Sequence, residues 1–547
     1  MKTVARYARI GAMTIGACGC AAWGHEESEM PGARPEQLGK VSFSVSCSAP
    51  AQGEFNRAMA LFHSFWFRPA IESFQKVLQL DPECGMADWG IAFMSMGNPL
   101  AWPANPKAMQ AAAAAMVDAE RADAKTPRER DYIAALGVFF KDWETADFRP
   151  RAVALQHEME ALAARYPQDD EAQILCALVL DATALPTDKT YANQLKAAAI
   201  LEPLFKKYPD HPGVAHYLIH TYDYADLAEK GLPSARAYGR IAPSVPHALH
   251  MPSHIYARLG MWHEMIQSNR DSYQASRGDL GVKTLNVGAY DALHAMDYLA
   301  FGELQLAQDK AARQVVDEVA AIQKVNVENF VSAYAFAAIP SRFALERADW
   351  KAAAALKLSP VDLAWNRFPQ AEAVLVYARG LGAARIGNVA AARADAQRLQ
   401  ALKDAMVAAK NGYWSGQADF QIKAVNAWIA LAEKRNDEAL QLMRAAADVE
   451  EASDKHPVTP GNVVPSRELL GEMLLATGQP QQALVEFERS LKRDPNRFRA
   501  IYGAARAAQA AGNRELARTH YAKLQEQASG SDSERPELVQ AREFLAM

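Results

Sequence analysis

Histidines gather in one stretch of this 547-residue chain, where eight of the 13 fall between residues 211 and 294. Their spacing is regular, since His216 recurs 34 residues later as His250. His220 recurs at the same interval as His254. Imidazole nitrogen is a ligand that suits zinc, copper and iron, so this cluster predicts a first-row transition metal as cofactor.

The same interval organises the C-terminal part of the chain. Over residues 464–524 it relates residues of matching type: Leu470 and Ala504, Gly478 and Gly512, Ala483 and Ala517, and Phe487 and Tyr521. Small residues let two helices approach, the glycine allows a turn, and the aromatic ring fills the space between hairpins. Pro495 ends the second helix, because proline cannot continue one. The pattern resembles the tetratricopeptide repeat (TPR), a helical hairpin of 34 residues.

Weaker copies of this pattern occur earlier in the chain. Ala70, Phe74 and Pro82 keep the spacing of the C-terminal part, and Pro209 and Pro243 are 34 residues apart. The intervening sequence is rich in alanine and has helical rather than strand-type periodicity. The predicted fold class is therefore all-α, a TPR-type helical-hairpin solenoid or superhelix in which each repeat packs against its neighbours.

The repeat register places the histidines at equivalent positions of two consecutive repeats. With Pro209 and Pro243 as thirty-second residues, one histidine pair occupies position 5, the other position 9, and His247 position 2. The TPR resemblance implies that these positions line the concave groove. Five of the six carry histidine, the exception being Gly213. Residues four apart share a helix face, so four imidazoles are predicted to converge on one point.

Five further residues are candidates for this site. His294 and Asp297, three residues apart on one predicted helix face, would supply further metal ligands. Asp223 and Tyr222 follow the histidines of the first repeat and would form hydrogen bonds that orient the imidazoles. Arg258, at position 13, would place a cation on the groove floor and so favour an anionic ligand.

Three functions remain open for this groove. The preferred one is a binding or scaffold protein that holds a transition metal there. The second is a metal-dependent enzyme, a hydrolase or an oxidoreductase, whose metal keeps an open coordination position. The third is a metal-free scaffold that binds a protein or peptide partner. Four histidines with His247 would favour closed coordination, whereas three histidines with Asp297 would favour catalysis.

Other motifs carry less chemistry. Residues 263–267 begin like a zinc-protease HExxH pattern but have glutamine in place of the second histidine. The aromatic residues around His63, Phe65 included, are predicted to be repeat core rather than a ligand cage. His211 is predicted to be a structural or surface residue.

Composition excludes other classes of function. The chain has 59 Lys and Arg against 64 Asp and Glu, so it lacks the basic field that a nucleic-acid partner requires. It has no uninterrupted apolar stretch of about 18 residues, which argues against a transmembrane helix. Five scattered cysteines are too few for a disulfide framework, although export would allow one bond among Cys47, Cys84 and Cys176.

The first residues have the layout of an export signal. Basic residues at positions 2, 6 and 9 precede a short apolar run over residues 10–17. The tetrad that ends at Cys18 resembles the bacterial lipobox, in which that cysteine carries the lipid. Cleavage after Ala22 would instead release a soluble protein. We expect a location in the periplasm or cell envelope, with membrane contact only through the lipid anchor.

These patterns divide the chain into five parts. They are a signal peptide of lipoprotein type (1–17), a flexible N-terminal segment (18–50), a TPR-like solenoid with the histidine-lined groove (51–350), degenerate TPR-like helices (351–455) and C-terminal TPR repeats (456–547). Two proline-rich breaks, at residues 97–106 and 456–461, are predicted to be plain connections between repeats.

Three passages resemble a widespread group of exported bacterial TPR proteins. They are HSFWF with DPECGMADWGIA (63–67, 81–92), HPGVAHYLIHTYD with PHALHMPSHIYARLGMW (211–223, 246–262), and HPVTPG with RELLGEMLLATGQ and PNRFRAIYGAARAA (456–461, 467–479, 495–508). The resemblance covers nearly the whole chain beyond residue 50, and the histidine passage is its most specific part. It implies a TPR solenoid of the cell envelope and no particular activity.

Overall fold

The computed structural model describes residues 36–122, 124–279 and 287–547. Residues Gln37–Met547 form one compact unit. The predicted signal peptide and Cys18 lie outside the described residues. Within the described part, no helix is both long and apolar enough to cross a membrane.

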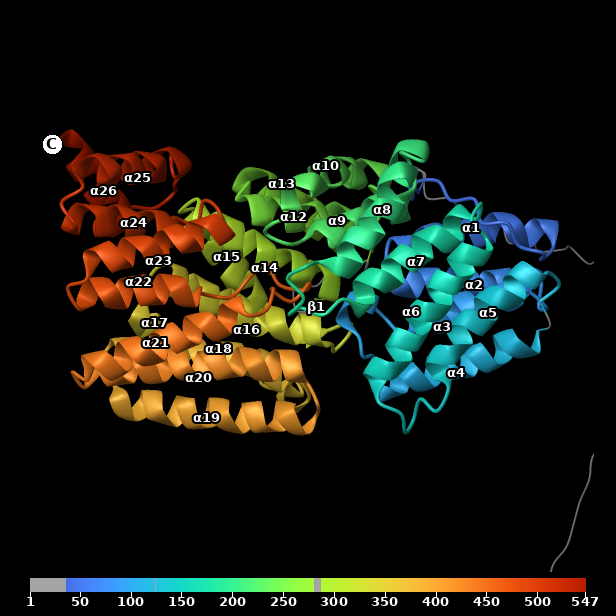
Figure 1. Ribbon diagram of the computed structural model, residues 1–547, viewed down its shortest axis with the longest axis horizontal. Coiled ribbons are helices and arrows are strands. Elements are labelled where there is room, and N and C mark those ends of the chain that lie inside the picture. The colour runs from blue at the N-terminus through green and yellow to red at the C-terminus, as the bar shows by residue number, and fades with distance from the viewer. Residues whose placement is uncertain (1–35, 123, 280–286) are drawn as a thin grey trace, which may run out of the picture. The chain divides into compact units, whose positions relative to one another are not determined.

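Antiparallel helices follow one another along the first half of the unit (Figure 1). They are α1 (Ala49–His63), α2 (Phe67–Leu80), α3 (Gly85–Ser95), α4 (Pro106–Arg121), α5 (Pro127–Phe140), α6 (Phe148–Arg165), α7 (Asp170–Thr183), α8 (Ala192–Lys207), α9 (Pro212–Tyr222), α10 (Leu232–Ile241), α11 (Pro246–His250), α12 (Pro252–Leu259) and α13 (Trp262–Asp279). Neighbours in sequence pack as hairpins, as α1 does with α2 and α3 with α4.

The second half continues the same arrangement. Its helices are α14 (Tyr290–Gln305), α15 (Asp309–Ala321), α16 (Phe330–Glu346), α17 (Trp350–Ala354), α18 (Pro369–Arg385), α19 (Val389–Ala408), α20 (Gly412–Ala432), α21 (Asn436–Glu451), α22 (Ser466–Ala476), α23 (Pro480–Arg493), α24 (Phe498–Ala510), α25 (Arg514–Gln527) and α26 (Pro536–Ala546). Three 3-10 turns (Pro99–Ala101, Ala228–Gly231, Trp365–Arg367) and two short paired strands, β1 (Val287–Gly288) and β2 (Lys324–Val325), complete the described elements. The predicted all-α, TPR-type solenoid is confirmed.

Helix ends follow the residue types that the repeat pattern provides. Gly478 and Gly512 adopt left-handed φ values of 77° and 80° at the turns before α23 and α25, a conformation that costs glycine no strain. α23 ends two residues before Pro495. The Asn513 side chain accepts a hydrogen bond in the first turn of α25 and so caps that helix.

Aromatic rings fill the space between hairpins. The ring of Phe487 lies against α22 and α24 where those helices carry Gly471 and Gly503. A Cβ added at Gly471 would lie 2.7 Å from a ring carbon, and one added at Gly503 would lie closer still. Phe74 packs in the same way against Gly90 near the N-terminus. Close ring-to-glycine packing therefore joins neighbouring repeats.

Residues 37–48 pack against the helices, although the sequence predicts a flexible segment there. Phe43 is fully buried, and its ring centroid lies 5.4 Å from that of Phe55. Cys47 forms a disulfide with Cys84, directly before α3. A buried aromatic ring and a covalent bond thus order this part of the predicted flexible segment.

The segment between α21 and α22, residues 452–465, contacts helices far away in the sequence. The Lys455 ammonium lies 2.5 Å from the carboxylate of Asp223. Arg342 donates hydrogen bonds to two backbone carbonyl oxygens of the segment, at 2.6 and 3.1 Å. The prediction of a plain connection is wrong at residues 456–461, because Arg342 donates to the carbonyl oxygen of Gly461 and the ring of His456 packs against Phe330 and Trp414. The other break, at residues 97–106, joins α3 to α4, and its Trp102 ring packs against Phe139 on α5 and Phe148 on α6.

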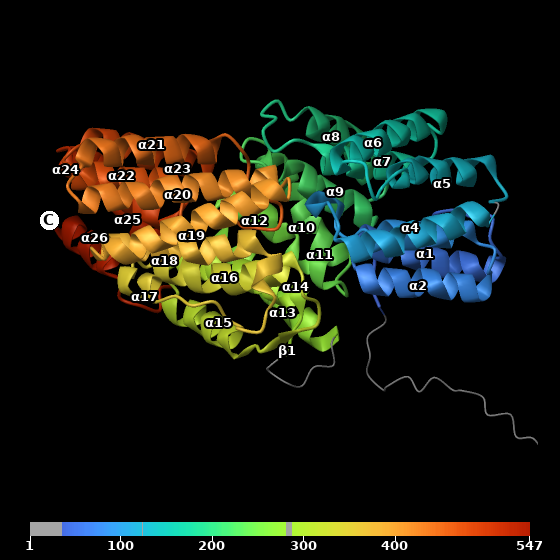
Figure 2. The same ribbon diagram turned by 90° about the horizontal axis from the view of Figure 1, so that it is seen from below.

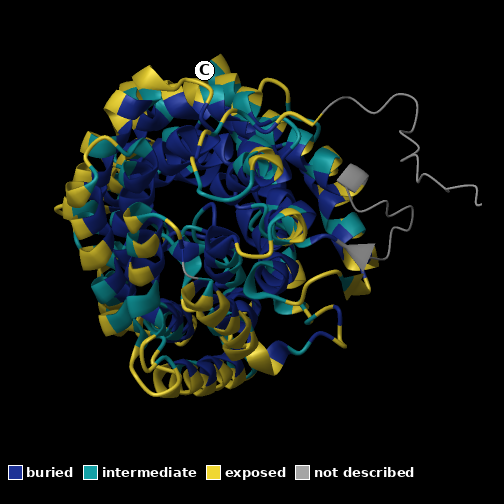
Figure 3. Ribbon diagram, turned by 90° about the vertical axis from the view of Figure 1, so that its right-hand side faces the viewer, coloured by how far each residue is buried: buried dark blue, intermediate teal, exposed yellow. Residues whose placement is uncertain are grey.

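The helices that carry the histidine stretch lie next to one another (Figure 2). α9 packs against α10, α10 against α12, α12 against α13, and α13 against α14. Buried residues face inward and exposed residues outward along the helices (Figure 3). Ile219, Met251 and Leu293 are fully buried between these helices, so apolar packing holds the candidate site in place.

Candidate metal centre

Four helices, α9, α11, α12 and α14, carry six histidines of the candidate site. Pro252 begins α12 directly after α11, so the first helix of the second repeat is divided into two short helices. His247, before this division, faces His216 on α9. His254, after the division, faces His250. The six histidines form two groups of three.

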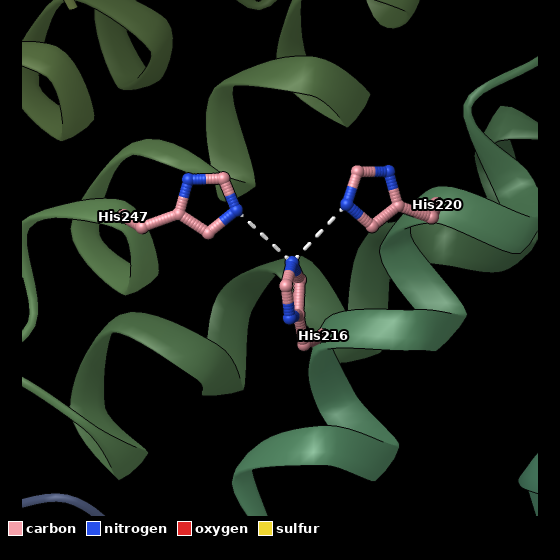
Figure 4. A group of neighbouring side chains, drawn as sticks. All are labelled: His216, His220 and His247. Carbon is pink, nitrogen blue, oxygen red and sulfur yellow. Dashed lines mark hydrogen bonds between the residues drawn. The ribbon is translucent and has the colours of Figure 1, made fainter. Parts of the chain in front are cut away.

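The first group consists of His216, His220 and His247. The Nε2 atoms of His220 and His247 each lie 3.1 Å from Nε2 of His216 (Figure 4). One candidate ligand nitrogen from each residue lies within 4.8 Å of the others. Nitrogens bonded at about 2.0–2.1 Å to one tetrahedral ion lie about 3.3 Å apart, so these separations suit a shared metal.

The second group consists of His250, His254 and His294. The Nε2 atoms of His250 and His254 are 3.0 Å apart. The ring centroid of His294, on α14, lies 4.2 Å from that of His250. One candidate nitrogen from each residue again lies within 4.8 Å of the others. Three successive hairpins therefore contribute ligands to the two groups.

Hydrogen bonds at Nδ1 fix the proton on His216 and His254. Nδ1 of His216 lies 2.7 Å from the backbone carbonyl oxygen of His63. Nδ1 of His254 lies 2.9 Å from a carboxylate oxygen of Asp223. A carbonyl and a carboxylate only accept, so each Nδ1 donates, and Nε2 of the neutral ring keeps its lone pair.

The same holds for His250. Its Nδ1 lies 2.7 Å from Oδ1 of Asn269. The amide nitrogen of Asn269 donates to the carbonyl oxygen of Met265 at 2.7 Å, which fixes the orientation of the amide. Nδ1 of His250 must therefore be the donor, and its Nε2 also carries a lone pair.

These lone pairs face one another. Since the protons of His250 and His254 are both at Nδ1, neither ring can donate to the other across their 3.0 Å separation. Two facing lone pairs repel, and a cation between them converts that repulsion into two bonds. Burial lowers the pKa of both histidines, which disfavours an extra proton in this role. The arrangement is suited to a metal ion.

Aromatic rings cover both groups. The ring centroid of Phe65 lies 4.5 Å from that of His216, and Tyr238 stacks on His216 at 5.1 Å. The ring of Tyr298 lies 5.0 Å from that of His254, with its hydroxyl oxygen 3.3 Å from Nε2. The sequence predicts Phe65 as repeat core, whereas its ring packs on the histidines. Such an apolar cover limits access of water to a bound ion.

A charged cluster adjoins the second group. The carboxylate of Asp223 accepts hydrogen bonds from Nδ1 of His254, from Nε of Arg258 at 2.9 Å and from Lys455 at 2.5 Å. Burial alone would raise the pKa of Asp223, but Lys455 and Arg258 hold it below its usual range. Burial lowers the pKa of Lys455 to about 8. The carboxylate of Asp454 also acts on both Arg258 and Lys455, so the charges of this cluster compensate one another.

A third histidine group differs from the first two. Glu171 accepts a hydrogen bond from Nε2 of His63 at 2.9 Å and from Nε2 of His211 at 3.1 Å. Nδ1 of His63 accepts from the hydroxyl of Tyr217, and Nδ1 of His211 accepts from the backbone N–H of Val214. Every ring nitrogen here has a complementary partner, so this group is satisfied by hydrogen bonds alone.

The predicted convergence of four imidazoles on one point is corrected to two separate groups. His247 belongs to the first group, whereas His250, on the same helix α11, belongs to the second with His254 and His294. Gly213, which is the one predicted groove position without a histidine, also has a physical reason. A Cβ at that position would lie 2.5 Å from Nδ1 of His63, so the His63 ring takes the space that a side chain would need.

Three predicted site residues make other contacts. Asp297 lies in neither group, because its carboxylate is paired with the buried guanidinium of Arg342 at 2.8 Å. The hydroxyl of Tyr222 donates to Glu202 at 2.6 Å rather than to a histidine. Arg258 is bound by the side chain and backbone oxygens of Asp223, so its charge is already compensated.

Sequence reasoning missed the partners that orient the rings. Asn269, Lys455 and the backbone of His63 reach the site across 19, 232 and 153 residues of chain, respectively. Glu171 joins His63 across 108 residues. The repeat period carries no signal for such contacts, although Lys455 borders the proline-rich break at residues 456–461.

Comparison with known proteins agrees with the repeat assignment. The family model of the tetratricopeptide repeat matches residues 474–542. No curated protein matches the sequence.

Solved structures with some likeness include a tetratricopeptide repeat protein from Parabacteroides merdae, at 10% identity over 56% of this chain and 98% of that one, with a TM-score of 0.28. A human IFIT1 dimer with PPP-AAAA is similar at 10% identity over 81% of this chain and 91% of that one, with a TM-score of 0.36. The APC/C hetero-tetramer Cut9–Hcn1 is similar at 12% identity over 91% of this chain and 89% of that one, with a TM-score of 0.32. Because their TM-scores are below 0.5, these structures give no information about what this chain binds.

Proposed function

We propose that this chain is an exported TPR solenoid that binds a first-row transition metal through its two buried histidine groups. The observation that carries the proposal is the His250 and His254 pair, whose Nε2 lone pairs face each other at 3.0 Å while both protons are held at Nδ1. The group around Glu171 supports it by contrast, since its rings are satisfied without a cation.

Export belongs to the same proposal. The basic and then apolar layout of residues 1–17 supports a signal peptide, and Cys18 supports a lipid anchor in the periplasm or cell envelope. The disulfide between Cys47 and Cys84 is a second support, because such bonds persist mainly in oxidising compartments. The predicted resemblance to exported TPR proteins with the same histidine passages agrees with this location.

A peptide partner in the groove is the alternative that TPR repeats suggest, since such repeats commonly bind proteins. Against it, residues 452–465 of the chain itself reach the second histidine group, where Lys455 contacts Asp223. A peptide binding beside that group would have to displace this segment. A metal-free scaffold role leaves the facing lone pairs of His250 and His254 unexplained. A metal-dependent enzyme, the other alternative, would use the same histidine groups.

Metal analysis of the purified chain tests the proposal. We expect tag-free protein, washed with a chelator of low affinity, to contain at least one transition-metal ion per chain by mass spectrometry. The double variant His220→Ala/His254→Ala should lose it, because each histidine group is then broken. His157→Ala is the matched control, since that side chain is 70% exposed and far from both groups in sequence.

Thermal unfolding gives the second readout. A ligand that binds only the folded state at 100 times its Kd raises the free energy of unfolding by about 2.7 kcal/mol. We expect added zinc or copper to raise the Tm of metal-stripped wild-type protein and of His157→Ala, but not of the double variant. Wild-type protein that contains no metal and gains no stability from either ion would overturn the proposal.

A further inference from the structure

The two histidine groups are close enough to act together. The ring centroids of His220 and His254 are 6.0 Å apart, and those of His247 and His250 are 6.1 Å apart. Each group has its own close Nε2 pair, at 3.1 Å in the first and 3.0 Å in the second. In the first group, Nε2 of His220 and Nε2 of His247 both lie near the single lone pair of His216, which can accept a hydrogen bond from only one of them. Each group therefore offers its own ligand set for one cation.

The ligand set of both groups is entirely imidazole. The buried carboxylates nearest in this part of the structure are already paired: Asp223 with Arg258 and Lys455, and Asp297 with Arg342. Paired iron or manganese sites in helical proteins are typically rich in carboxylates. Imidazole donors without carboxylate suit copper.

The charges around the two histidine groups also favour copper. Six neutral imidazoles bring no negative charge, and the carboxylate of Asp223 beside the second group is already paired with Arg258 and Lys455. Uncompensated positive charge is costly to bury, so two monovalent ions are easier to accommodate than two divalent ones. Among the first-row metals, copper has a stable monovalent state. Each ion would be bound by three histidines, which leaves it one free coordination position.

We infer that the two groups form a paired copper centre, with one copper ion held by His216, His220 and His247 and a second held by His250, His254 and His294. The inference rests on the proposed metal binding and goes beyond it in the number, identity and pairing of the ions. Because the groups are neighbours, a small ligand could bridge the free positions of both ions.

Titration of the metal-stripped full chain tests this inference. Copper(I), supplied under nitrogen in competition with a chromogenic chelator, should bind at two ions per chain in wild type and in His157→Ala. His216→Ala should retain one ion, and His250→Ala should also retain one. Nδ1 of His247 and of His294 has no acceptor among the described residues, so His247→Ala and His294→Ala are milder variants if the first two fail to fold by circular dichroism. Each should weaken the binding of one copper ion at least tenfold.

Electron paramagnetic resonance provides the test of pairing. Wild type loaded with two copper(II) ions should show a half-field signal from dipolar coupling, and each single-group variant should lose it. One ion per chain, lost in both variants, would overturn the pairing while leaving the proposed metal binding intact. Two ions retained in both variants would overturn both proposals, because the metal would then be bound elsewhere. A chain that binds zinc but no copper would overturn only the copper inference.

Discussion

Single hydrogen bonds decide what the histidines of this chain can bind. His250 offers a lone pair at Nε2 because Asn269 accepts its Nδ1 proton at 2.7 Å. His63 has its Nδ1 facing the Tyr217 hydroxyl and its Nε2 facing Glu171, which leaves no free lone pair. Identical side chains thus become candidate ligands or structural groups according to what accepts their protons.

This dependence predicts the effect of changing Asn269. In Asn269→Leu the acceptor is lost, so the His250 proton can move to Nε2 and donate to Nε2 of His254. We expect metal affinity to fall about 10–100-fold, the usual effect of removing such an orienting partner. Competition titration against a chelator would measure it. Unchanged affinity in a folded variant would show that the Asn269 bond does not set the tautomer.

Glu303 on α14 predicts a pH dependence of stability. It is buried, Arg270 donates to one of its oxygens at 3.1 Å, and its other oxygen has no hydrogen-bond partner among the described residues. Burial raises its pKa from 4.5 to about 7. The protonated form is therefore favoured by folding, and its stabilisation is complete below about pH 4.5 and is lost as the pH rises through about 7.

The variant Glu303→Gln keeps a hydrogen-bonding side chain without this titration. Between pH 4.5 and 8 the wild type should lose on the order of 3 kcal/mol of unfolding free energy relative to the variant. Urea unfolding at several pH values measures the difference, in which the contributions of other groups cancel. Parallel profiles for the two proteins would contradict the assignment.

At the scale of the elements, neighbouring repeats pack closely where a helix carries a glycine. A Cβ at Gly503 would overlap the Phe487 ring, whereas a Cβ at Gly416, inside α20, would meet nothing within 4 Å. Gly503→Ala should lower the free energy of unfolding by about 1–3 kcal/mol through overpacking. Gly416→Ala should raise it by about 0.5–1 kcal/mol through helix propensity. Denaturant midpoints of the two variants check the opposite signs.

The elements were largely predictable because their determinants are local. The 34-residue spacing of Gly478 and Gly512 marks the turns, and Pro495 marks the end of α23. The same spacing locates the histidines in adjacent repeats. It does not reveal that His247 and His250, both on α11, belong to different groups. Contacts of Lys455 and Glu171 depend on chain folding over more than 100 residues, for which periodicity carries no information.

At the scale of the whole unit, buried ion pairs join segments far apart in the chain. Arg342 on α16 pairs with Asp297 on α14 and donates to backbone oxygens of residues 452–465. Arg497 contacts Glu346 at 2.7 Å. These contacts fix the segment that carries Lys455 against the helices of the histidine groups. Contacts between hairpins that are neighbours in sequence are therefore not the only ones that stabilise this unit.

Removing Arg342 should test this long-range connection. Arg342→Leu leaves the carboxylate of Asp297 buried without a counter-charge, and such a change costs about 3–5 kcal/mol. In Arg342→Leu/Asp297→Leu that carboxylate is gone as well, so most of the loss should be recovered. Thermal unfolding of the single and double variants measures both effects. A double variant no more stable than Arg342→Leu would contradict the proposed role of the pair.

The location of bound metal is the most direct measurement of the central claim. Crystals of the chain, soaked with copper and measured at the copper absorption edge, would give anomalous peaks at the ions themselves. We expect two peaks, one among the Nε2 atoms of His216, His220 and His247 and one among the ligand nitrogens of His250, His254 and His294. Fully occupied crystals whose peaks lie only at surface histidines such as His157, with both groups empty, would contradict the claim.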